Sequence, residues 1–438
     1  MTGRHTNVPA TAGAAMHALV AELYPLCRSI TGNGVRQTLE ILGKRLALDV
    51  HEVPSGTQVF DWMIPREWNI RDAYIADRDG RRVVDFRRSN LHVMSYSAPV
   101  RARMTLPELR PHLFTRPDWA EVVPYRTSYY KETWGFCLSE RTLQQMREDE
   151  YDVVIDSTLE PGSLTYGEHY LPGATDDEVL ISCHVCHPSL ANDNLSAIAV
   201  AVTLAEALAA RPSRRYSYRF LFIPGTIGSI TWLARNEERV GRIKHGLILA
   251  GLGAGEGFTY KKSRRGDAEI DRAVGHVLRD AKGAVAVNDF SPYGYDERQF
   301  CSPGFNLPVG CLMKTPHGTY REYHTSADDV QFVTLAALTE SLETLERIVD
   351  VLEHNVRYVN LSPKCEPQLG RRGLYRSLGG EMDAASRELA MLWVLNMSDG
   401  GPALLDIADR AALPFQTIQA AAAALANHGL LKPVTDLS

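Results

Sequence analysis

The sequence predicts an α/β protein with a mostly parallel central sheet, extended by a small β-rich inserted domain and a helical C-terminal unit. From Tyr151 onward, segments with strand patterns alternate with segments of helical spacing. Such alternation is typical of an α/β domain with a largely parallel sheet. Between about residues 53 and 123 the sequence changes to short strands and turns, and after Cys365 it becomes helical again. We therefore expect one central domain and two smaller ones.

Length and composition limit the class of protein. The 438 residues exceed one ordinary domain, and the content of 45% hydrophobic and 23% charged residues is that of a globular protein. The longest apolar runs are shorter than the roughly 20 residues that a bilayer span needs. The first residues lack the pattern of a secretory signal. These features predict no membrane span and a cytoplasmic location.

The hydrophobic spacing predicts the individual elements. Helices are expected between Ala14 and Leu48 on either side of a RSITGNG loop, and an Asp79-Gly80 pair predicts a hairpin in the inserted domain. The predicted strands of the α/β domain are DVVIDST, SLTYGEHYLP, EVLISCH, SYRFLFIP, HGLILAGLG and LPVGCLM. Its helices are expected after Asn194, from about Ile270 to Asp280, and from Leu335 to His354.

These elements give a set of predicted domain limits. The α/β domain takes residues 1–52 and 124–365, the inserted β-rich domain takes residues 53–123, and the C-terminal unit takes residues 366–438.

A metal-site pattern follows the predicted strand EVLISCH. The segment CHVCHPSLANDNLS leaves a buried strand with His184 and reaches Asp193 nine residues later, in a loop that can fold back toward the histidine. Neutral imidazole and carboxylate are ligand types that zinc selects, and catalytic sites use three protein ligands. The segment YREYHTSADD places His324 after another strand and loop. We predict that His184, Asp193 and His324 bind the metal.

The number of cysteines argues against a disulfide framework. Seven in so long a chain is an odd, low count, which predicts reduced thiols. Cys183 to His187 spell C-x-x-C-H, the attachment signature of c-type haem. Haem attachment requires export, and neither the first residues nor the buried strand before Cys183 fits that reading.

Several segments together resemble a known family. They are RSITGNGVRQTL, PSGTQVFDWMIPREWNIRDAYI, SNLHVMSYS, PYRTSYYKETWGFC, CHPSLANDNLS, YDERQFCSPGFNLPV and YHTSADD, and they run from Arg28 to Asp329. The chain is similar to zinc aminopeptidases of the bacterial leucyl aminopeptidase and glutaminyl cyclase type. More closely, it resembles the bacterial aminopeptidase-like family, which adds an inserted β domain and a C-terminal winged helix. The resemblance implies a three-layer, phosphorylase/hydrolase-like domain.

The resemblance also implies residue roles. His184 takes the first zinc-ligand position, with His187 as a rival, Asp193 the bridging carboxylate, and His324 the last ligand. Where the aminopeptidases carry paired glutamates, this chain has Gly225 and Thr226, and near a further expected aspartate it has Ala254. The loss of acidic ligands predicts about one zinc per chain.

Because the paired glutamates are missing, another residue must act as the general base. Asp296 and Glu297 in YGYDERQF match a segment that lines the active site of the zinc aminopeptidases, so they are the predicted catalytic residues, with Glu256 and Glu322 behind them. The alternative for both acids is a salt bridge to Arg298 or a helix cap. Arg264 in the basic loop YKKSRRG and Tyr323 beside His324 are the predicted substrate-binding residues, although the basic loop also fits a solvated turn.

The C-terminal unit has the order of a winged helix: ELAMLWVLNM, LLDIADRAALP, then PFQTIQAAAAALANHGLLKPV. The recognition helix expected from Phe415 to Asn427 has no charged residue, and a DNA reader needs cations for phosphates. From Arg371 onward the sequence contains six basic residues (371, 372, 376, 387, 410, 432) and seven acidic residues (381, 383, 388, 399, 406, 409, 436). We predict an interaction or dimerisation module that supports a homo-oligomer.

Two functions from different classes remain. The first is a zinc-dependent hydrolase that cleaves an amide bond in a peptide-like or aminoacylated small molecule through a metal-activated water. The second is a non-catalytic ligand- or metal-binding regulatory protein that acts through its winged helix. The net charge of −6 disfavours a nucleic acid as the main partner. The retained ligands favour the enzyme, and the missing glutamates favour the regulator.

Overall fold

A computed structural model describes residues 11–374 and 382–434. Part of the stretch used to judge a secretory signal, residues 1–10, lies outside them. The chain divides into two compact units, one of residues 1–271 and 281–344 and the other of residues 272–280 and 345–438. In the described ranges, no helix has both the length and the apolar character that a membrane span requires.

The first unit is built on an eight-stranded mixed sheet. Its order is β1-β10-β12-β11-β13-β16-β14-β15. The strands are β1 (Asp49–Pro54), β10 (Ser163–Leu171), β11 (Glu178–His184), β12 (Ser217–Ile223), β13 (Ile243–Ala250), β14 (Phe258–Lys261), β15 (Val285–Asn288) and β16 (Val309–Met313). The four central strands β12, β11, β13 and β16 are parallel. Strand β10 pairs antiparallel with β1 and β12, and β14 pairs antiparallel with β16 and parallel with β15. The predicted α/β fold is confirmed.

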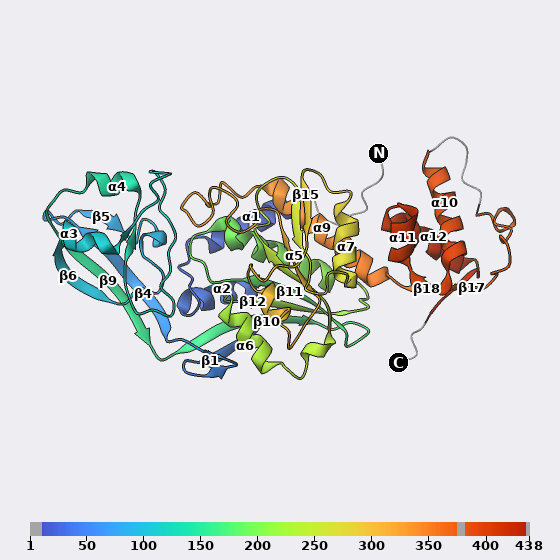
Figure 1. The fold of residues 1–438 in the computed structure, drawn as a ribbon, viewed down its shortest axis with the longest axis horizontal. Helices are drawn as coiled ribbons and strands as arrows, with labels where there is room; N and C mark the ends of the chain where they lie inside the picture. The colour runs from blue at the N-terminus through green and yellow to red at the C-terminus, as the bar shows by residue number, and fades with distance from the viewer. Residues whose placement is uncertain (1–10, 375–381, 435–438) are drawn as a thin grey trace. The chain divides into compact units, whose positions relative to one another are not determined.

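Helices cover both faces of this sheet, which explains why its central strands β11 and β12 are buried throughout. Every residue of β11 and β12 is buried. Helices α1 and α5 lie together on one face and α6 lies on the other (Figure 1). The helices that accompany this sheet are α1 (Ala12–Leu23), α2 (Asn33–Gly43), α5 (Ala197–Ala209), α6 (Ile227–Arg235) and α8 (Glu297–Phe300). The residues of α7 (Glu269–Leu278) and α9 (Leu335–His354) are divided between the two units.

A second, four-stranded antiparallel sheet has the order β5-β4-β9-β6. Its strands are β4 (Glu67–Ala76), β5 (Arg82–Asp85), β6 (Val100–Thr105) and β9 (Glu150–Glu160). Gly80, with φ +78°, turns the predicted hairpin between β4 and β5. The segment DVVIDST, predicted as a strand of the large sheet, is part of β9 and pairs with β4 and β6. That assignment was wrong because alternation along the chain does not reveal pairing with strands some 50 to 80 residues earlier.

Short elements complete this β-rich region. They are β2 (Gln58–Val59), β3 (Trp62–Met63), β7 (Leu113–Phe114), β8 (Phe136–Cys137), α3 (Leu106–Leu109) and α4 (Glu140–Gln145).

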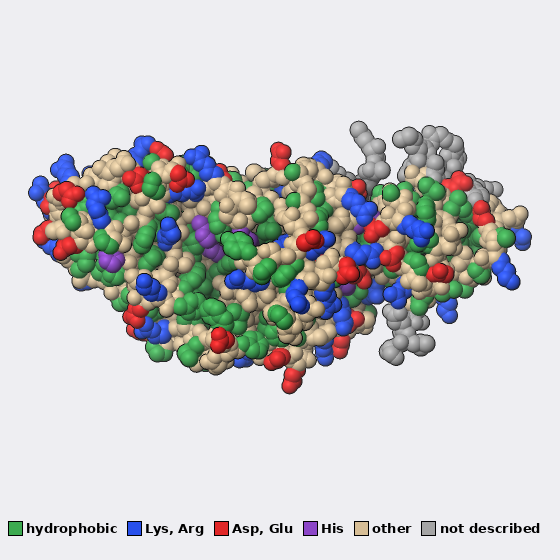
Figure 2. Space-filling view, in the orientation of Figure 1, with side chains coloured by type: hydrophobic (Ala, Val, Ile, Leu, Met, Phe, Trp, Pro, Cys, Tyr) green, Lys and Arg blue, Asp and Glu red, His purple; other side chains and the backbone are tan. Residues whose placement is uncertain are grey.

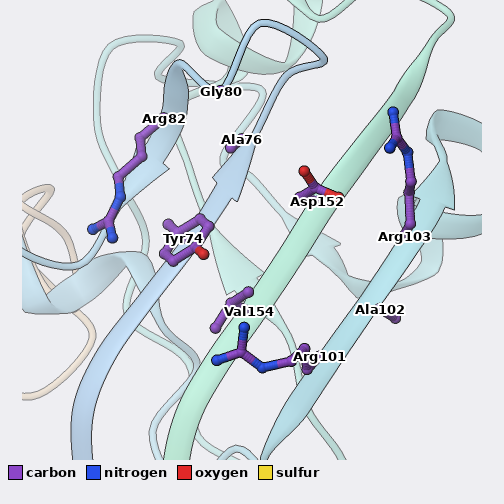
Figure 3. Close-up of a pocket in the computed structure, with 9 residues that line it drawn as sticks. All are labelled: Tyr74, Ala76, Gly80, Arg82, Arg101, Ala102, Arg103, Asp152 and Val154. Carbon is purple, nitrogen blue, oxygen red and sulfur yellow. The ribbon is translucent and has the colours of Figure 1, made fainter.

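A pocket of about 520 Å³ lies on the four-stranded sheet. It is lined by Tyr74, Ala76, Gly80, Arg82, Arg101, Ala102, Arg103, Asp152 and Val154 (Figure 3). Arg82 stacks on Tyr74 at 4.0 Å and is paired with Asp72, and Arg103 is paired with Glu150. These ion pairs occupy two of its three arginines, and none of its lining residues is a predicted site residue.

The second unit contains a three-stranded antiparallel sheet and a helical bundle. The strands β18 (Asp399–Ala403), β17 (Arg357–Asn360) and β19 (Leu431–Pro433) lie in that order, with α10 (Met382–Met397), α11 (Leu404–Ala411) and α12 (Phe415–Asn427). Strand β17 begins before the predicted limit at residue 366, because its partners β18 and β19 belong to the C-terminal segment. Of the charges counted there, those of residues 376, 381 and 436 lie outside the described residues.

Candidate metal centre

The end of β11 and the start of α5 bring the predicted ligands together. His184 is the last residue of β11, and Asp193 lies in the short helical segment Ala191–Ser196 that precedes α5. The Nε2 atom of His184 lies 2.9 Å from Asp193 Oδ1, and that of His324 lies 3.0 Å from Asp193 Oδ2. His187 is close as well, with its Nε2 4.0 Å from Asp193 Oδ2. Three imidazoles therefore surround one carboxylate.

Buried hydrogen bonds fix the segment that carries Asp193. The carboxylate of Asp328 accepts the backbone N–H groups of Asn192 at 2.6 Å and of Asp193 at 3.1 Å. The Asn194 side chain donates to Leu249 O at 2.9 Å and accepts from Gly251 N at 3.1 Å. Because these bonds join the segment to the end of β13 and to the loop after His324, the position of Asp193 is set by two distant parts of the chain.

The electrostatics of the cluster favour the protonation states that a metal needs. Burial alone would raise the pKa of Asp193, but His187, His184 and His324 outweigh it and hold that pKa well below its usual range. Burial lowers the pKa of His187 well below its usual value. Metal ligands must be a deprotonated carboxylate and neutral imidazoles. Asp193 and His187 meet these conditions.

The donor set fits zinc. One donor atom each from His184, His187 and Asp193 lies within 4.8 Å of the others, and His324 adds a fourth group on the Oδ2 side of Asp193. Imidazole nitrogen and carboxylate oxygen are ligands that zinc takes in catalytic sites. The sequence treated His187 as a rival of His184, but the structure brings both beside Asp193.

Tyrosine rings frame the cluster. Tyr295 packs on His184 with ring centres 4.3 Å apart, and Tyr323 stacks on His324 at 3.9 Å with an interplanar angle of 12°. A Cβ atom added at Gly225 would overlap the Tyr295 ring. The place that the resemblance assigns to a glutamate is therefore filled by a tyrosine from another loop.

The two predicted catalytic acids have partners of their own. Glu297 is buried, forms an ion pair with Lys261 and accepts the backbone N–H of Tyr295. Asp296 is fully buried, and its Oδ1 accepts the hydroxyl of Ser229 at 2.8 Å. Burial raises the pKa of Asp296 to about 7. Neither acid is in a salt bridge with Arg298 among the described residues, and neither hydrogen-bonds there to a histidine of the cluster.

The predicted substrate-binding residues differ in position. Tyr323 lies in the cluster, as its stacking on His324 shows. Arg264 instead donates to Asn306 Oδ1 at 3.0 Å, and the neighbouring Arg265 donates to Asn306 O at 2.8 Å. Among the described residues no contact joins Arg264 to the cluster.

Sequence reasoning missed His317 and Tyr295. The His317 ring lies 6.5 Å from that of His184 and 5.6 Å from that of Tyr295, and burial lowers its pKa. The available signal was weak: a histidine in a Pro-His-Gly turn, seven residues before His324.

The cluster is open to solvent on one side. The His324 side chain is 32% exposed, whereas those of His184 and Asp193 are almost fully buried. In the space-filling view, histidine side chains reach the surface of the first unit with hydrophobic side chains beside them (Figure 2). A small molecule can therefore approach from the His324 side.

Solved structures define the class of this fold. A zinc aminopeptidase from Bacillus subtilis superposes with a TM-score of 0.56 at 13% identity, over 79% of this chain and 96% of its own. A peptidase M28 precursor from Shewanella amazonensis gives 0.54 at 13% identity, over 78% and 94%. At such low identity these likenesses show the fold alone. The fold is that of the zinc aminopeptidases, and the second unit adds a winged helix.

Closer comparisons place the chain in a family. A model described as "Domain of unknown function (DUF4910)" matches residues 17–355, and a winged helix-turn-helix model matches residues 356–433. The chain belongs to this aminopeptidase-like family, as the resemblance implied. A Clostridium acetobutylicum protein named "Putative polysaccharide biosynthesis protein with aminopeptidase-like domain" is 51% identical over 422 residues, 96% of this chain and 97% of its own. A crystal structure of a "putative peptidase" from that organism has a TM-score of 0.92 at 49% identity, covering 97% and 98%.

Proposed function

We propose that the chain is a zinc-dependent hydrolase that cleaves an amide bond in a peptide-like or aminoacylated small molecule. The observation that carries the proposal is the buried Asp193 carboxylate, whose two oxygens face His184 and His324 at 2.9 and 3.0 Å. Zinc bound there would polarise the substrate carbonyl and lower the pKa of a water.

The residues of the chain have separate roles in this proposal. Asp193, His184 and His324 hold the metal, and His187 is a further donor within reach. About one zinc per chain is expected, because Gly225, Thr226 and Ala254 stand where the aminopeptidases carry further acids. Tyr323, stacked on His324 at the exposed side, contacts the substrate.

Either Glu297 or Asp296 takes the proton from the attacking water in this proposal. Asp296 has a pKa of about 7, raised by burial, and a general base works best when its pKa is near the working pH. Glu297 lies close enough to His317 for its charge to raise the pKa of that ring. Each acid must leave its present contacts, with Ser229 or Lys261, to reach the water.

The name of the Clostridium relative widens the substrate class. Because that protein is named for polysaccharide biosynthesis, acylated amino sugars belong beside aminoacyl amides among the substrates to test. In both compounds the reacting group is the same amide.

Zinc analysis and turnover test the proposal together. Protein purified without added metal should contain about one zinc per chain and should hydrolyse a member of a panel of aminoacyl 4-nitroanilides, acyl amides and N-acylated amino sugars. A His324→Ala variant should lose the zinc, since fewer protein ligands hold it poorly. Two zinc ions per chain, or full retention by the variant, would contradict the predicted site.

A specific observation also favours the non-catalytic alternative. The Tyr295 ring fills the space beside Gly225, where a glutamate would be needed for the usual chemistry. A zinc-loaded protein that binds compounds of the panel without turnover would support a regulatory protein that acts through its winged helix.

A further inference from the structure

His317 has a buried nitrogen without a partner. Its Nε2 is inaccessible and makes no hydrogen bond within residues 11–374 and 382–434. A buried polar atom without a partner destabilises the fold, so it calls for a functional explanation. The atom is not in the apolar core: the ring centre lies 6.5 Å from that of His184 and 6.3 Å from that of Tyr323.

The turn that carries His317 is held against the metal-site segment. The Thr315 N–H donates to Gly251 O at 3.1 Å, and Asn192 Nδ2 donates to Thr315 Oγ1 at 2.6 Å. On the other side of the histidine, the Thr319 hydroxyl donates to Pro316 O at 2.8 Å. Because Asn192 precedes Asp193 in the chain, these bonds fix His317 relative to the carboxylate of the cluster.

His317 lies outside the group of metal donors. His184, His187 and Asp193 form a compact group whose donor atoms lie within 4.8 Å of one another, and His317 is not part of it. It faces the rings of Tyr295 and Tyr323 instead. The centre of its ring lies 6.5 Å from that of His184, so His317 is beside the donor group without belonging to it.

We propose that Nε2 of His317 donates a hydrogen bond to the acyl oxygen of the amide substrate and is a catalytic residue of the hydrolysis. The inference rests on the proposed function. In that function, negative charge develops on the acyl oxygen when water attacks the amide, and no residue of the chain has yet been assigned to donate a hydrogen bond to it. A donor fixed before the reaction begins stabilises this charge, and removing one such donor typically lowers kcat about 10²- to 10³-fold.

The test compares two substitutions. His317→Leu removes the donor and fills the space, whereas His317→Gln restores an N–H at similar reach. The Leu variant should lose about 10²- to 10³-fold in kcat, keep its zinc and unfold at the same or a higher temperature. The Gln variant should recover a substantial part of kcat. His245→Leu is the matched control, because His245 is buried with both nitrogens unpartnered but lies at the opposite end of β13 from the site. It should leave kcat unchanged.

A binding measurement separates failure of this inference from failure of the proposed function. The probe is the phosphonic acid analogue of leucine, whose phosphonate oxygens take the place of the acyl oxygen. The parent should bind it at least ten times more tightly than His317→Leu. Equal binding, equal kcat or loss of zinc in the Leu variant would overturn the role of His317 and leave the hydrolase proposal standing. A parent that neither cleaves the panel nor binds the phosphonate would overturn both.

Discussion

Asp193 is the residue on which the electrostatics of the site depend. A carboxylate so deeply buried is costly to ionise, and three imidazoles offset that cost and hold its pKa well below its usual range. Each histidine therefore both offers a metal donor and contributes to the low pKa of Asp193. Substituting one of them affects the metal and the carboxylate together.

Asp296 gives a pH-dependent prediction at the scale of one residue. Burial raises its pKa from 3.8 to about 7, so between these values the folded protein keeps a proton that the unfolded chain releases. The free energy of unfolding should therefore fall as the pH rises from about 4 to about 7, by about 1.4 kcal/mol per pH unit from this group. Asp296→Asn imitates the protonated acid and should remove that part of the slope.

Denaturant unfolding of parent and variant at several pH values measures the effect. Asp328, whose pKa burial also raises to about 7, titrates in both proteins and cancels in the difference. A parent-minus-variant difference that stays constant from pH 4 to pH 7 would show that Asp296 is ionised throughout.

Glu297 gives a prediction on activity. With an active parent, Glu297→Gln should lower turnover about 10²- to 10⁴-fold at unchanged zinc content if this acid is the base. Lys261→Met is the matched control, because it breaks the same ion pair and keeps the carboxylate. Both variants should lose stability, since each leaves a buried group unpaired. Equal turnover in Glu297→Gln and the parent would show that Glu297 is not the general base and would leave Asp296 as the candidate.

Among the elements, the loop after β11 depends on a buried arginine. Arg28, in the loop between α1 and α2, is fully buried and donates to His187 O at 2.8 Å, Pro188 O at 3.2 Å and Leu23 O at 2.7 Å. One planar guanidinium thus joins the first helices to the backbone that carries His187. A lysine ammonium cannot make this set of bonds.

We predict that Arg28→Lys lowers the free energy of unfolding by about 2–4 kcal/mol, because hydrogen bonds to a charged donor are lost, and that it weakens zinc retention against a chelator. Chemical denaturation and chelator competition measure the two effects. Arg45→Lys, which alters a partly exposed pair with Glu206, should change stability by less than about 1 kcal/mol. If both variants behave alike, Arg28 does not position the loop.

For the whole molecule, the prediction concerns the winged helix. Because β17 pairs with β18 and β19, a deletion should remove residues 356–438 rather than begin at Arg371. The shortened protein should keep its zinc and change its oligomeric state or partner binding. Light scattering and metal analysis of both proteins measure this. Unchanged assembly together with lost zinc would contradict it.

The absence of charge on α12 extends this prediction to nucleic acid. The helix Phe415–Asn427 has no charged residue, so the full chain should bind duplex DNA weakly, without the steep salt dependence that phosphate contacts cause. Tight binding that weakens strongly between low and physiological salt would contradict the interaction-module prediction.

The sequence by itself determined the elements and the polar residues at their ends. Helices α9 and α12 begin and end where hydrophobic spacing predicted, and β11 is the buried strand expected before His184. Local periodicity suffices for these elements because each buries a face or a whole strand of its own. His184, Asp193 and His324 were visible because imidazole and carboxylate groups followed apolar strands.

Only the tertiary structure decided which of these residues meet. Strand β9 belongs to the four-stranded sheet and pairs with β4. Tyr295 fills the space beside Gly225, and Glu297 forms an ion pair with Lys261. His187 lies beside Asp193 together with His184 rather than in its place, and His317 comes near the cluster through a loop that the sequence alone did not connect with it. The physical reason is that pairing and packing between distant segments depend on the shape of the whole core, whereas the spacing of residues along the chain records only the face that each element buries.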